Sequence, residues 1–445
     1  MSIGGFIMSS YVRRKTPGNT EWFVRDRFGM FIHFGLYSML ARHEWIKSRE
    51  KISNESYQKY FDNFNPDLFD AREWAKAAKA AGMKYAVLTT KHHEGFCLFD
   101  SEYTDYKITN TPFGRDLVKE YVEAFRAEGL KVGFYYSLID WHHPEFPIDK
   151  FHPMRDLPNA AEINKSRDVK KYAEYMRNQV RELLSNYGKI DILWFDFSYK
   201  PDPKYAHLGG GGKNKEDWES EKLIAVAREL QPEIIIDNRA DVEQDLTTPE
   251  QYQVEEWPRH AETGELLTWE ACQTFSGSWG YYRDEMTWKS PQMLVEMLCK
   301  TVALGGNLLM NVGPCARGYF DKRAVDALAV YGEWMKYNSR SICGCTMAEP
   351  EFKAPNGTVM TQSEDGKRLY IHLFSYPFIN LPVENLADKI KYVQFLHDAS
   401  EIQYSVGTRH GTCGDVVSAG EKTVYFKLPV VKPDVIVPVI EIILK

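Results

Sequence analysis

The chain has 445 residues, of which 44% are hydrophobic and 26% charged, and its formal net charge is −7. Because single cores usually stop growing at roughly 250 to 300 residues, a large domain and a smaller one are expected. The mild acidity, without long runs of one sign, argues against a nucleic-acid partner, and no apolar stretch predicts a membrane span.

The cysteines and the N-terminus bear on the compartment. Seven scattered cysteines fit no complete disulfide framework, which favours reduced thiols and a cytoplasmic location. The segment from Met1 to Met8 has no basic region, no sustained apolar region and no small-residue cleavage site before Arg13. A cleaved secretion signal is therefore not expected.

Short apolar runs alternate with helical periodicity up to about residue 340, a pattern typical of βα units around a parallel sheet. Strands are predicted at 28–34, 84–89, 131–136, 190–195, 233–237 and 307–312, with weaker candidates near Tyr252 and Trp269. Helices are predicted at 70–78, 114–129, 168–187, 215–230 and 291–304. Eight strands are the number that a closed (β/α)8 TIM barrel needs.

After Ser339 the helical period gives way to alternating runs at 368–374, 391–396, 423–428 and 435–444. Such runs predict a small C-terminal β-sandwich. We therefore expect a (β/α)8-like barrel over residues 1–345 and a β-sandwich over residues 346–445. An accessory sandwich packed on the barrel is favoured over a carbohydrate-binding one.

The active site of such a barrel lies at the carboxyl ends of its strands. Four predicted strands end there in His33, in His92 and His93, in Asp196 and in Arg239. A buried histidine by itself is more often a core residue than a ligand. Four neighbouring strand ends that carry such groups favour a functional site, because each group, if buried for structural reasons alone, would need a hydrogen-bond or charge partner.

Asp196 follows an apolar strand, so its carboxylate must be held by donors, which Arg239 and the three histidines could supply for a nucleophile. An aspartate capping the next loop is the alternative. A retaining glycosidase also needs a second carboxyl group about 5 to 5.5 Å away. Sequence spacing does not choose among the candidates, which are Glu250, Glu255, Glu256 and Glu270.

At this point three motifs become recognisable: Gly29 to Gly35, Thr89 to Phe96 and Leu193 to Asp196 together resemble glycoside hydrolase family 29, the α-L-fucosidases. Further similar segments, in the family's order, are 135–141, 237–239, 248–251, 269–272, 278–281 and 306–314. The resemblance covers most of residues 20–340. It implies an enzyme that removes terminal α-L-fucose from oligosaccharides or glycoconjugates through a covalent intermediate on Asp196, without a metal or cofactor.

The same resemblance implies a set of binding residues. Those expected to contact fucose hydroxyls are His33, Trp45, His92, His93 and Arg239, and those expected to line an apolar wall for the C6 methyl are Phe31, Tyr136, Trp194 and Trp279. Such a wall would leave the extra hydroxyl of a galactose-type sugar unpaired. Glu250 is chosen as acid/base because Thr-Pro-Glu matches the family's usual position best. The long segment 197–218 could reshape the leaving-group side.

Three other functions remain open from the residues. A metal-dependent amidohydrolase would normally show His-x-His on its first strand, where this chain has His33-Phe34-Gly35. A glycosidase of the same fold that acts on galactosides is a second alternative. A non-catalytic sugar-binding protein would be expected only if the site lacked a second carboxylate.

Overall fold

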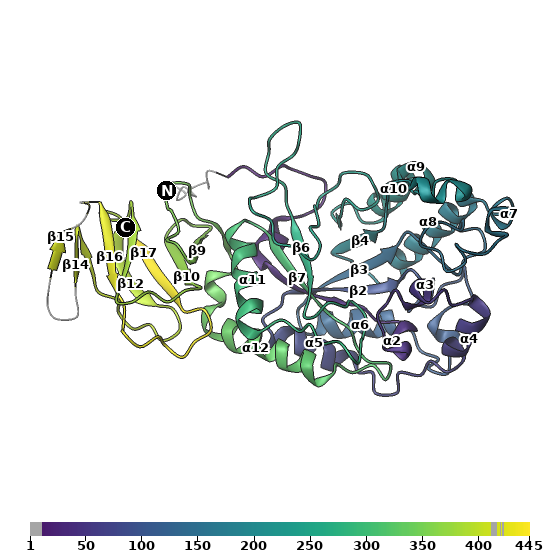
Figure 1. The fold of residues 1–445 in the computed structure, drawn as a ribbon, viewed down its shortest axis with the longest axis horizontal. Helices are drawn as coiled ribbons and strands as arrows, with labels where there is room; N and C mark the ends of the chain where they lie inside the picture. The colour runs from purple at the N-terminus through teal and green to yellow at the C-terminus, as the bar shows by residue number, and fades with distance from the viewer. Residues whose placement is uncertain (1–10, 411–415, 419, 421) are drawn as a thin grey trace.

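The computed structural model describes residues 11–410, 416–418, 420 and 422–445. Cys413 and the N-terminal residues considered above for a secretion signal lie outside these ranges. The molecule is elongated, with a parallel sheet and its helices in one half and antiparallel sheets in the other (Figure 1). None of the described helices is long and apolar enough to cross a membrane.

Seven parallel strands, in the order β5-β4-β3-β2-β1-β7-β6, form the sheet of the larger half. Their bounds are β1 Phe28–Ile32, β2 Tyr85–Lys91, β3 Lys131–Ser137, β4 Ile192–Asp196, β5 Ile235–Ile236, β6 Glu270–Thr274 and β7 Asn307–Val312. The six clearer predicted strands are confirmed, and so is the weaker one near Trp269.

The predicted strand near Tyr252 is wrong, and the described residues form no complete eight-stranded barrel. Tyr252 lies in a loop with 59% of its surface exposed. The gap between β5 and β6 is spanned by segment 246–250, which makes isolated parallel bridges instead of a regular strand: Leu246 with Asp237, Thr247 with Trp269, and Glu250 with Cys272. Two features limit pairing there, because β5 has only two residues and Pro249 lacks an N–H to donate.

Side chains alternate across each parallel strand and so divide between two cores. The core on the inner face includes Phe31, Val87, Tyr135, Trp194 and Cys272. The other face packs against the helices and includes Ile32, Leu88, Tyr136, Phe195 and Met310. A residue's position in its strand therefore decides whether its side chain faces the interior of the curled sheet.

Helices and short turns surround this sheet, and several begin at an aspartate or serine whose side chain accepts a backbone N–H, a common N-cap. Their bounds are α1 Glu21–Asp26, α2 Tyr37–Leu40, α3 Ile46–Arg49, α4 Asn54–Asp62, α5 Ala71–Ala80, α6 Leu117–Ala127, α7 Ala160–Asn164, α8 Val169–Asn186, α9 Lys215–Trp218, α10 Ser220–Leu230, α11 Pro291–Ala303 and α12 Lys322–Asn338. The single helix predicted over 215–230 is two helices, because Glu219 adopts φ +49°. Helix α12 is not among the predicted ones.

The C-terminal half contains a five-stranded antiparallel sheet, a three-stranded one and a two-stranded one. In sheet order these are β12 Ile390–Phe395, β17 Val439–Leu444, β10 Arg368–Leu373, β9 Thr358–Ser363 and β8 Cys345–Met347; then β11 Asn380–Glu384, β16 Thr423–Lys427 and β13 Tyr404–Val406; then β14 Thr408–His410 and β15 Val416–Ser418. Ile371 and Phe426, from the two larger sheets, share one hydrophobic core. The four predicted runs correspond to β10, β12, β16 and β17.

Helices α11 and α12 lie between the parallel sheet and the C-terminal sheets (Figure 1). Trp334 of α12 donates its indole N–H to the carbonyl of Val437 at 3.2 Å. Val437 and Val439 belong to the same buried cluster as the helix-facing residues of the parallel sheet. The two halves of the molecule thus share hydrophobic packing.

Candidate active site

A pocket lies at the carboxyl ends of the parallel strands and contains nearly all of the predicted site residues. Its lining is Phe31, His33, Trp45, His92, His93, Tyr135, Trp194, Asp196, Phe197, Arg239, Glu250, Cys272 and Trp279. Strands β1, β3, β4 and β6, and the loops that follow β2 and β5, deliver side chains there, because parallel strands all end at the same edge. Ten of the eleven predicted residues therefore meet, and Tyr136 is the exception.

Asp196 and Glu250 are joined through one nitrogen of Arg239. The Nη1 atom of Arg239 donates to Oδ1 of Asp196 at 2.8 Å and to Oε2 of Glu250 at 2.7 Å. Burial alone would lower the pKa of this guanidinium, but the negative charges of Asp196 and Glu250 outweigh it and raise the pKa above its ordinary value. Arg239 thus stays charged and holds both carboxylates in one place.

Arg239 is itself fixed on several sides. Its Nε donates to the hydroxyl of Thr248 at 2.9 Å, and its Nη2 donates to the Thr248 carbonyl at 3.1 Å. Its guanidinium also lies over the Trp194 ring, 4.5 Å from the centroid. A planar guanidinium that is stacked and bonded at both ends has little freedom to rotate.

Tyr135, and not Tyr136, enters the pocket. The Tyr135 hydroxyl donates to Oδ2 of Asp196 at 2.7 Å, so each carboxylate oxygen of Asp196 accepts one strong bond. Tyr136 is one residue further along β3 and faces the helices, where its hydroxyl donates to Gln179 at 2.8 Å. The placement of Tyr136 on the sugar wall is corrected, because a shift of one residue reverses the face of a strand.

The histidines present defined hydrogen-bonding groups. The Ser137 hydroxyl donates to the Ile139 carbonyl at 2.8 Å, so at the 2.7 Å contact with His93 it accepts from Nδ1–H. Asn311 uses its amide N–H on the Trp279 carbonyl at 2.6 Å, and its Oδ1 accepts from Nδ1 of His33 at 2.6 Å. In both neutral rings Nε2 then carries the lone pair.

Burial keeps these rings neutral. It lowers the pKa of His33 to about 3, against the raising effect of its bond to Asn311. It also lowers the pKa values of His92 and His93 well below the ordinary value, and the Lys91 ammonium lowers that of His93 further. Neutral imidazoles with a free Nε2 can accept hydrogen bonds from sugar hydroxyls.

The other candidate carboxylates lie elsewhere. Glu255 and Glu256 are exposed on the loop after segment 246–250. Glu270 is fully buried at the opposite end of β6, where Oε1 accepts from the Trp194 indole at 3.1 Å and Oε2 from the Tyr85 hydroxyl. Burial raises its pKa to about 7, against the lowering effect of the two hydrogen bonds. Of the four candidates, Glu250 is the one that lines the pocket.

Sequence reasoning missed Tyr135, Cys272 and Phe197. Strand alternation could have found Tyr135, since it pairs with Trp194 on the neighbouring strand and shares its face. Cys272 could have been found in the same way from the alternation of β6. Phe197 gave no such signal, because it follows the end of β4 and its placement depends on loop geometry.

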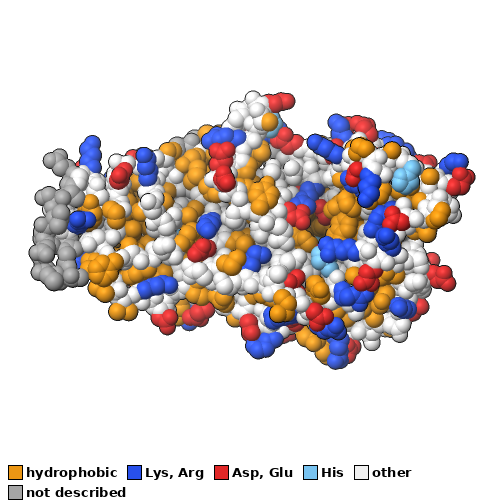
Figure 2. Space-filling model, viewed as in Figure 1, with side chains coloured by type: hydrophobic (Ala, Val, Ile, Leu, Met, Phe, Trp, Pro, Cys, Tyr) orange, Lys and Arg blue, Asp and Glu red, His pale blue; other side chains and the backbone are white. Residues whose placement is uncertain are grey.

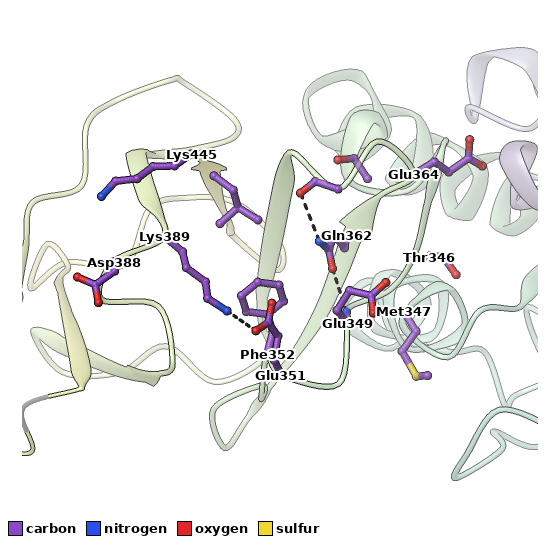
Figure 3. A pocket seen from close by; sticks show the side chains of 13 residues that line it. Thr346, Met347, Glu349, Glu351, Phe352, Gln362, Glu364, Asp388, Lys389 and Lys445 are labelled. Carbon is purple, nitrogen blue, oxygen red and sulfur yellow. Dashed lines mark hydrogen bonds and ion pairs between the residues drawn. The ribbon is translucent and has the colours of Figure 1, made fainter. Parts of the chain in front are cut away.

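A second hollow lies among the C-terminal sheets (Figure 3). There Lys389 forms an ion pair with Glu351, and the Gln362 side chain accepts the Glu349 N–H at 2.9 Å. On the face shown in Figure 2, acidic and basic side chains are interspersed along the molecule. Within the described ranges, no three His, Cys, Asp or Glu side chains are grouped so as to hold a metal ion.

Comparison with known proteins gives a consistent result. A family model described as alpha-L-fucosidase matches residues 9–340. Human plasma alpha-L-fucosidase is 31% identical over 356 residues, which are 72% of this chain and 68% of that protein. The alpha-L-fucosidase of Dictyostelium discoideum is 28% identical over 399 residues, or 82% of this chain and 79% of that one.

Solved structures agree over nearly the whole chain. Alpha-L-fucosidase isoenzyme 1 from Paenibacillus thiaminolyticus superposes with a TM-score of 0.85 at 43% identity, covering 96% of this chain and 98% of its own. A GH29 alpha-L-fucosidase from Bacteroides thetaiotaomicron, solved as a trapped covalent intermediate, gives 0.80 at 26% identity, covering 99% and 100%. With the family model spanning most of the chain, the resemblance seen in the sequence is confirmed: the protein belongs to the α-L-fucosidase family, glycoside hydrolase family 29.

Proposed function

We propose that this α-L-fucosidase works by double displacement with retention, with Asp196 as nucleophile and Glu250 as acid/base. One observation carries the proposal. Because the bonded oxygens of both carboxylates lie at 2.8 and 2.7 Å from the same Arg239 nitrogen, these two oxygens are at most about 5.5 Å apart. That separation does not exceed the roughly 5 to 5.5 Å of retaining enzymes and is short of the roughly 6.5 to 9.5 Å of inverting ones.

The two steps follow from these positions. Asp196 attacks the anomeric carbon while Glu250 gives its proton to the departing glycosidic oxygen, which forms a fucosyl ester and releases the leaving group. Glu250, now ionised, takes a proton from water, and the water oxygen displaces Asp196 and releases fucose. The Bacteroides relative was trapped as a covalent intermediate, which supports the ester.

The exposures of the two carboxylates agree with these roles. The Asp196 side chain is 12% exposed and the Glu250 side chain 41%. A nucleophile must meet the sugar inside the pocket, whereas an acid/base must also reach the leaving group and a water molecule at the rim. Arg239 connects the two and stabilises whichever carboxylate is ionised at each stage.

Fucose recognition follows from the rest of the lining. Nε2 of His33 and of His93 can accept from sugar hydroxyls, and the Trp45 indole can add a donor. The Phe31 ring packs edge-to-face against Trp279, with centroids 5.9 Å apart, and its centroid lies 5.2 Å from that of Trp194. These three rings give the C6 methyl an apolar wall. A galactoside would bury its extra hydroxyl against these rings without a partner.

The test uses Asp196→Gly and Glu250→Ala with 4-nitrophenyl α-L-fucoside, α- and β-galactosides, and a fucoside with a poor leaving group. We expect release from the fucoside alone, unchanged by EDTA, and loss of roughly 10³-fold or more in Asp196→Gly. Glu250→Ala should lose far more activity on the substrate with the poor leaving group than on the nitrophenyl fucoside. Added azide should restore turnover of the nitrophenyl fucoside, with fucosyl azide as the sugar product.

Glu256→Ala is the matched control, because Glu256 is an exposed glutamate on the loop that follows Glu250. It should match the wild type on every substrate. Full turnover by Asp196→Gly would rule out the nucleophile, and equal losses of Glu250→Ala on both leaving groups without azide rescue would rule out the acid/base. ¹H NMR of the first-formed fucose should show the α anomer, and initial β-fucose would exclude retention.

A further inference from the structure

Aromatic rings from three different loops meet beside the candidate active site. Trp45 directly precedes α3, Phe151 follows β3, and Phe197 and Tyr199 follow β4. Ring centroids are 5.0 Å apart for Trp45 and Phe197, 5.1 Å for Phe151 and Phe197, 4.9 Å for Phe151 and Tyr199, and 5.4 Å for Phe197 and Tyr199. Phe151, Phe197 and Tyr199, called here the aromatic rim, are all half-buried.

The backbone at Phe197 is unusual. This residue directly follows Asp196 and adopts φ +87°, a conformation that glycine takes freely and bulky side chains rarely do. Its ring lies 5.0 Å from that of His93 and lines the same pocket as Asp196. The chain therefore holds a strained phenylalanine in the pocket lining, directly after Asp196, and strained residues cluster at ligand-binding positions.

Hydrogen bonds fix the aromatic rim in place without a ligand. The Ser48 hydroxyl donates to the Phe151 carbonyl at 2.5 Å, which ties this loop to α3. The Asp149 carboxylate accepts the Phe151 N–H at 2.9 Å and also the Tyr199 hydroxyl. Tyr199 and Lys213 exchange two backbone bonds of 2.9 Å. Rings that are already ordered lose little entropy when a ligand binds.

We propose that the aromatic rim is the leaving-group subsite and that it binds the C–H face of the second pyranose of a fucosyl disaccharide. The inference rests on the proposed function, in which fucose fills the pocket against Asp196 and the leaving group extends past Phe197. Flat half-buried rings offer apolar area to such a face. The Lys150 ammonium lies 5.2 Å from the ring centroids of Phe151 and Tyr199. It donates one N–H to the Lys200 carbonyl at 2.8 Å, and its remaining N–H groups would serve the sugar's hydroxyls.

The experiment compares two kinds of fucoside that differ only in the leaving group. α-L-Fucosyl fluoride has no leaving-group sugar, whereas fucosyl disaccharides linked α1,2, α1,3, α1,4 and α1,6 each place a pyranose there. The variants are Phe197→Gly, which keeps the backbone conformation, and Phe151→Ala, which lies further from Asp196. Phe378→Ala is the matched control, because Phe378 is an exposed phenylalanine of the C-terminal domain.

For the best disaccharide, each rim variant should lose at least about tenfold in kcat/KM, as truncated interface aromatics do. For the fluoride, kcat/KM of Phe151→Ala should stay within about threefold of wild type, because Phe151 does not line the pocket that contains Asp196 and no rim contact is used. Phe197→Gly, whose ring lines that pocket, should lose more on the disaccharide than on the fluoride. Phe378→Ala should be unchanged on both. This split between substrates separates a binding subsite from a merely structural role, which would lower both rates together.

Equal losses on fluoride and disaccharide, or no loss on either, would overturn the subsite. Wild-type protein that hydrolyses the fluoride and none of the disaccharides would also overturn it. Failure of the wild type on every fucoside would instead count against the proposed function itself. The two failures are therefore distinguishable in one set of assays.

Discussion

Glu270→Gln should make the protein more stable at neutral pH, although it removes a buried hydrogen-bonded carboxylate. Burial raises the pKa of Glu270 from 4.5 to about 7. Between pH 4.5 and 7 the Glu270 carboxyl group is ionised in the unfolded chain but protonated in the folded protein. Its contribution to the free energy of unfolding is therefore full below pH 4.5 and is lost as pH rises to 7. The loss amounts to about 3 kcal/mol.

A glutamine does not ionise, so the variant avoids this loss. Its carbonyl can still accept from the Trp194 indole, and its amide can donate to the Tyr85 hydroxyl. We therefore expect the difference in Tm, variant minus wild type, to grow by roughly 3 to 4 °C between pH 4.5 and 7.5 for a chain of this length. Taking the difference cancels the other buried groups, including Glu44 and Glu94, whose pKa values burial likewise raises to about 7.

Differential scanning fluorimetry in buffers of equal ionic strength measures this difference. For Glu256→Gln, at an exposed position, the Tm difference from wild type should not change with pH. The reasoning is refuted if the Glu270→Gln difference stays flat or shrinks as pH rises. Kinetics on the poor-leaving-group fucoside give an independent check. Glu270→Gln should remain within about threefold of wild type, whereas removal of an acid/base costs about 10²- to 10⁴-fold.

Two further predictions concern neighbouring residues of the site. Tyr135→Phe should lower kcat/KM for 4-nitrophenyl fucoside at least about tenfold, because a hydrogen bond to a charged group contributes about 1.5 to 3 kcal/mol. Tyr136→Phe should lower Tm slightly and leave kcat/KM unchanged. Reversed effects would contradict the assignment of the two tyrosines to opposite faces of β3. Arg239→Lys should lower kcat/KM about 10²-fold or more, because a lysine cannot both stack on Trp194 and hold two carboxylates. Steady-state assays with circular dichroism as the folding control decide this, and a mild loss would show that Arg239 is not needed as the bridge.

Much of the site could be predicted from the sequence because parallel strands impose a simple rule. An apolar run that ends in Ile-His or Trp-Phe-Asp places its last polar residue at the common carboxyl edge, wherever the run lies in the chain. His33, His92, Asp196 and Arg239 could therefore be assigned to one pocket from spacing and chemistry. The family motifs then supplied the substrate and Glu250.

The tertiary structure decided what depends on register and on irregular backbone. Tyr135 and Tyr136 are adjacent and chemically identical, and the pairing of β3 with β4 shows that Tyr135 is the one that faces the pocket and reaches Asp196. Sequence spacing did not distinguish Glu250 from Glu270 as acid/base candidates. In the fold, an irregular segment places Glu250 beside Arg239, whereas Glu270 is buried at the start of β6, where it accepts the Trp194 indole N–H. Local sequence determines which side chains a strand end carries, but side-chain direction and loop path are set by contacts between segments far apart in the chain.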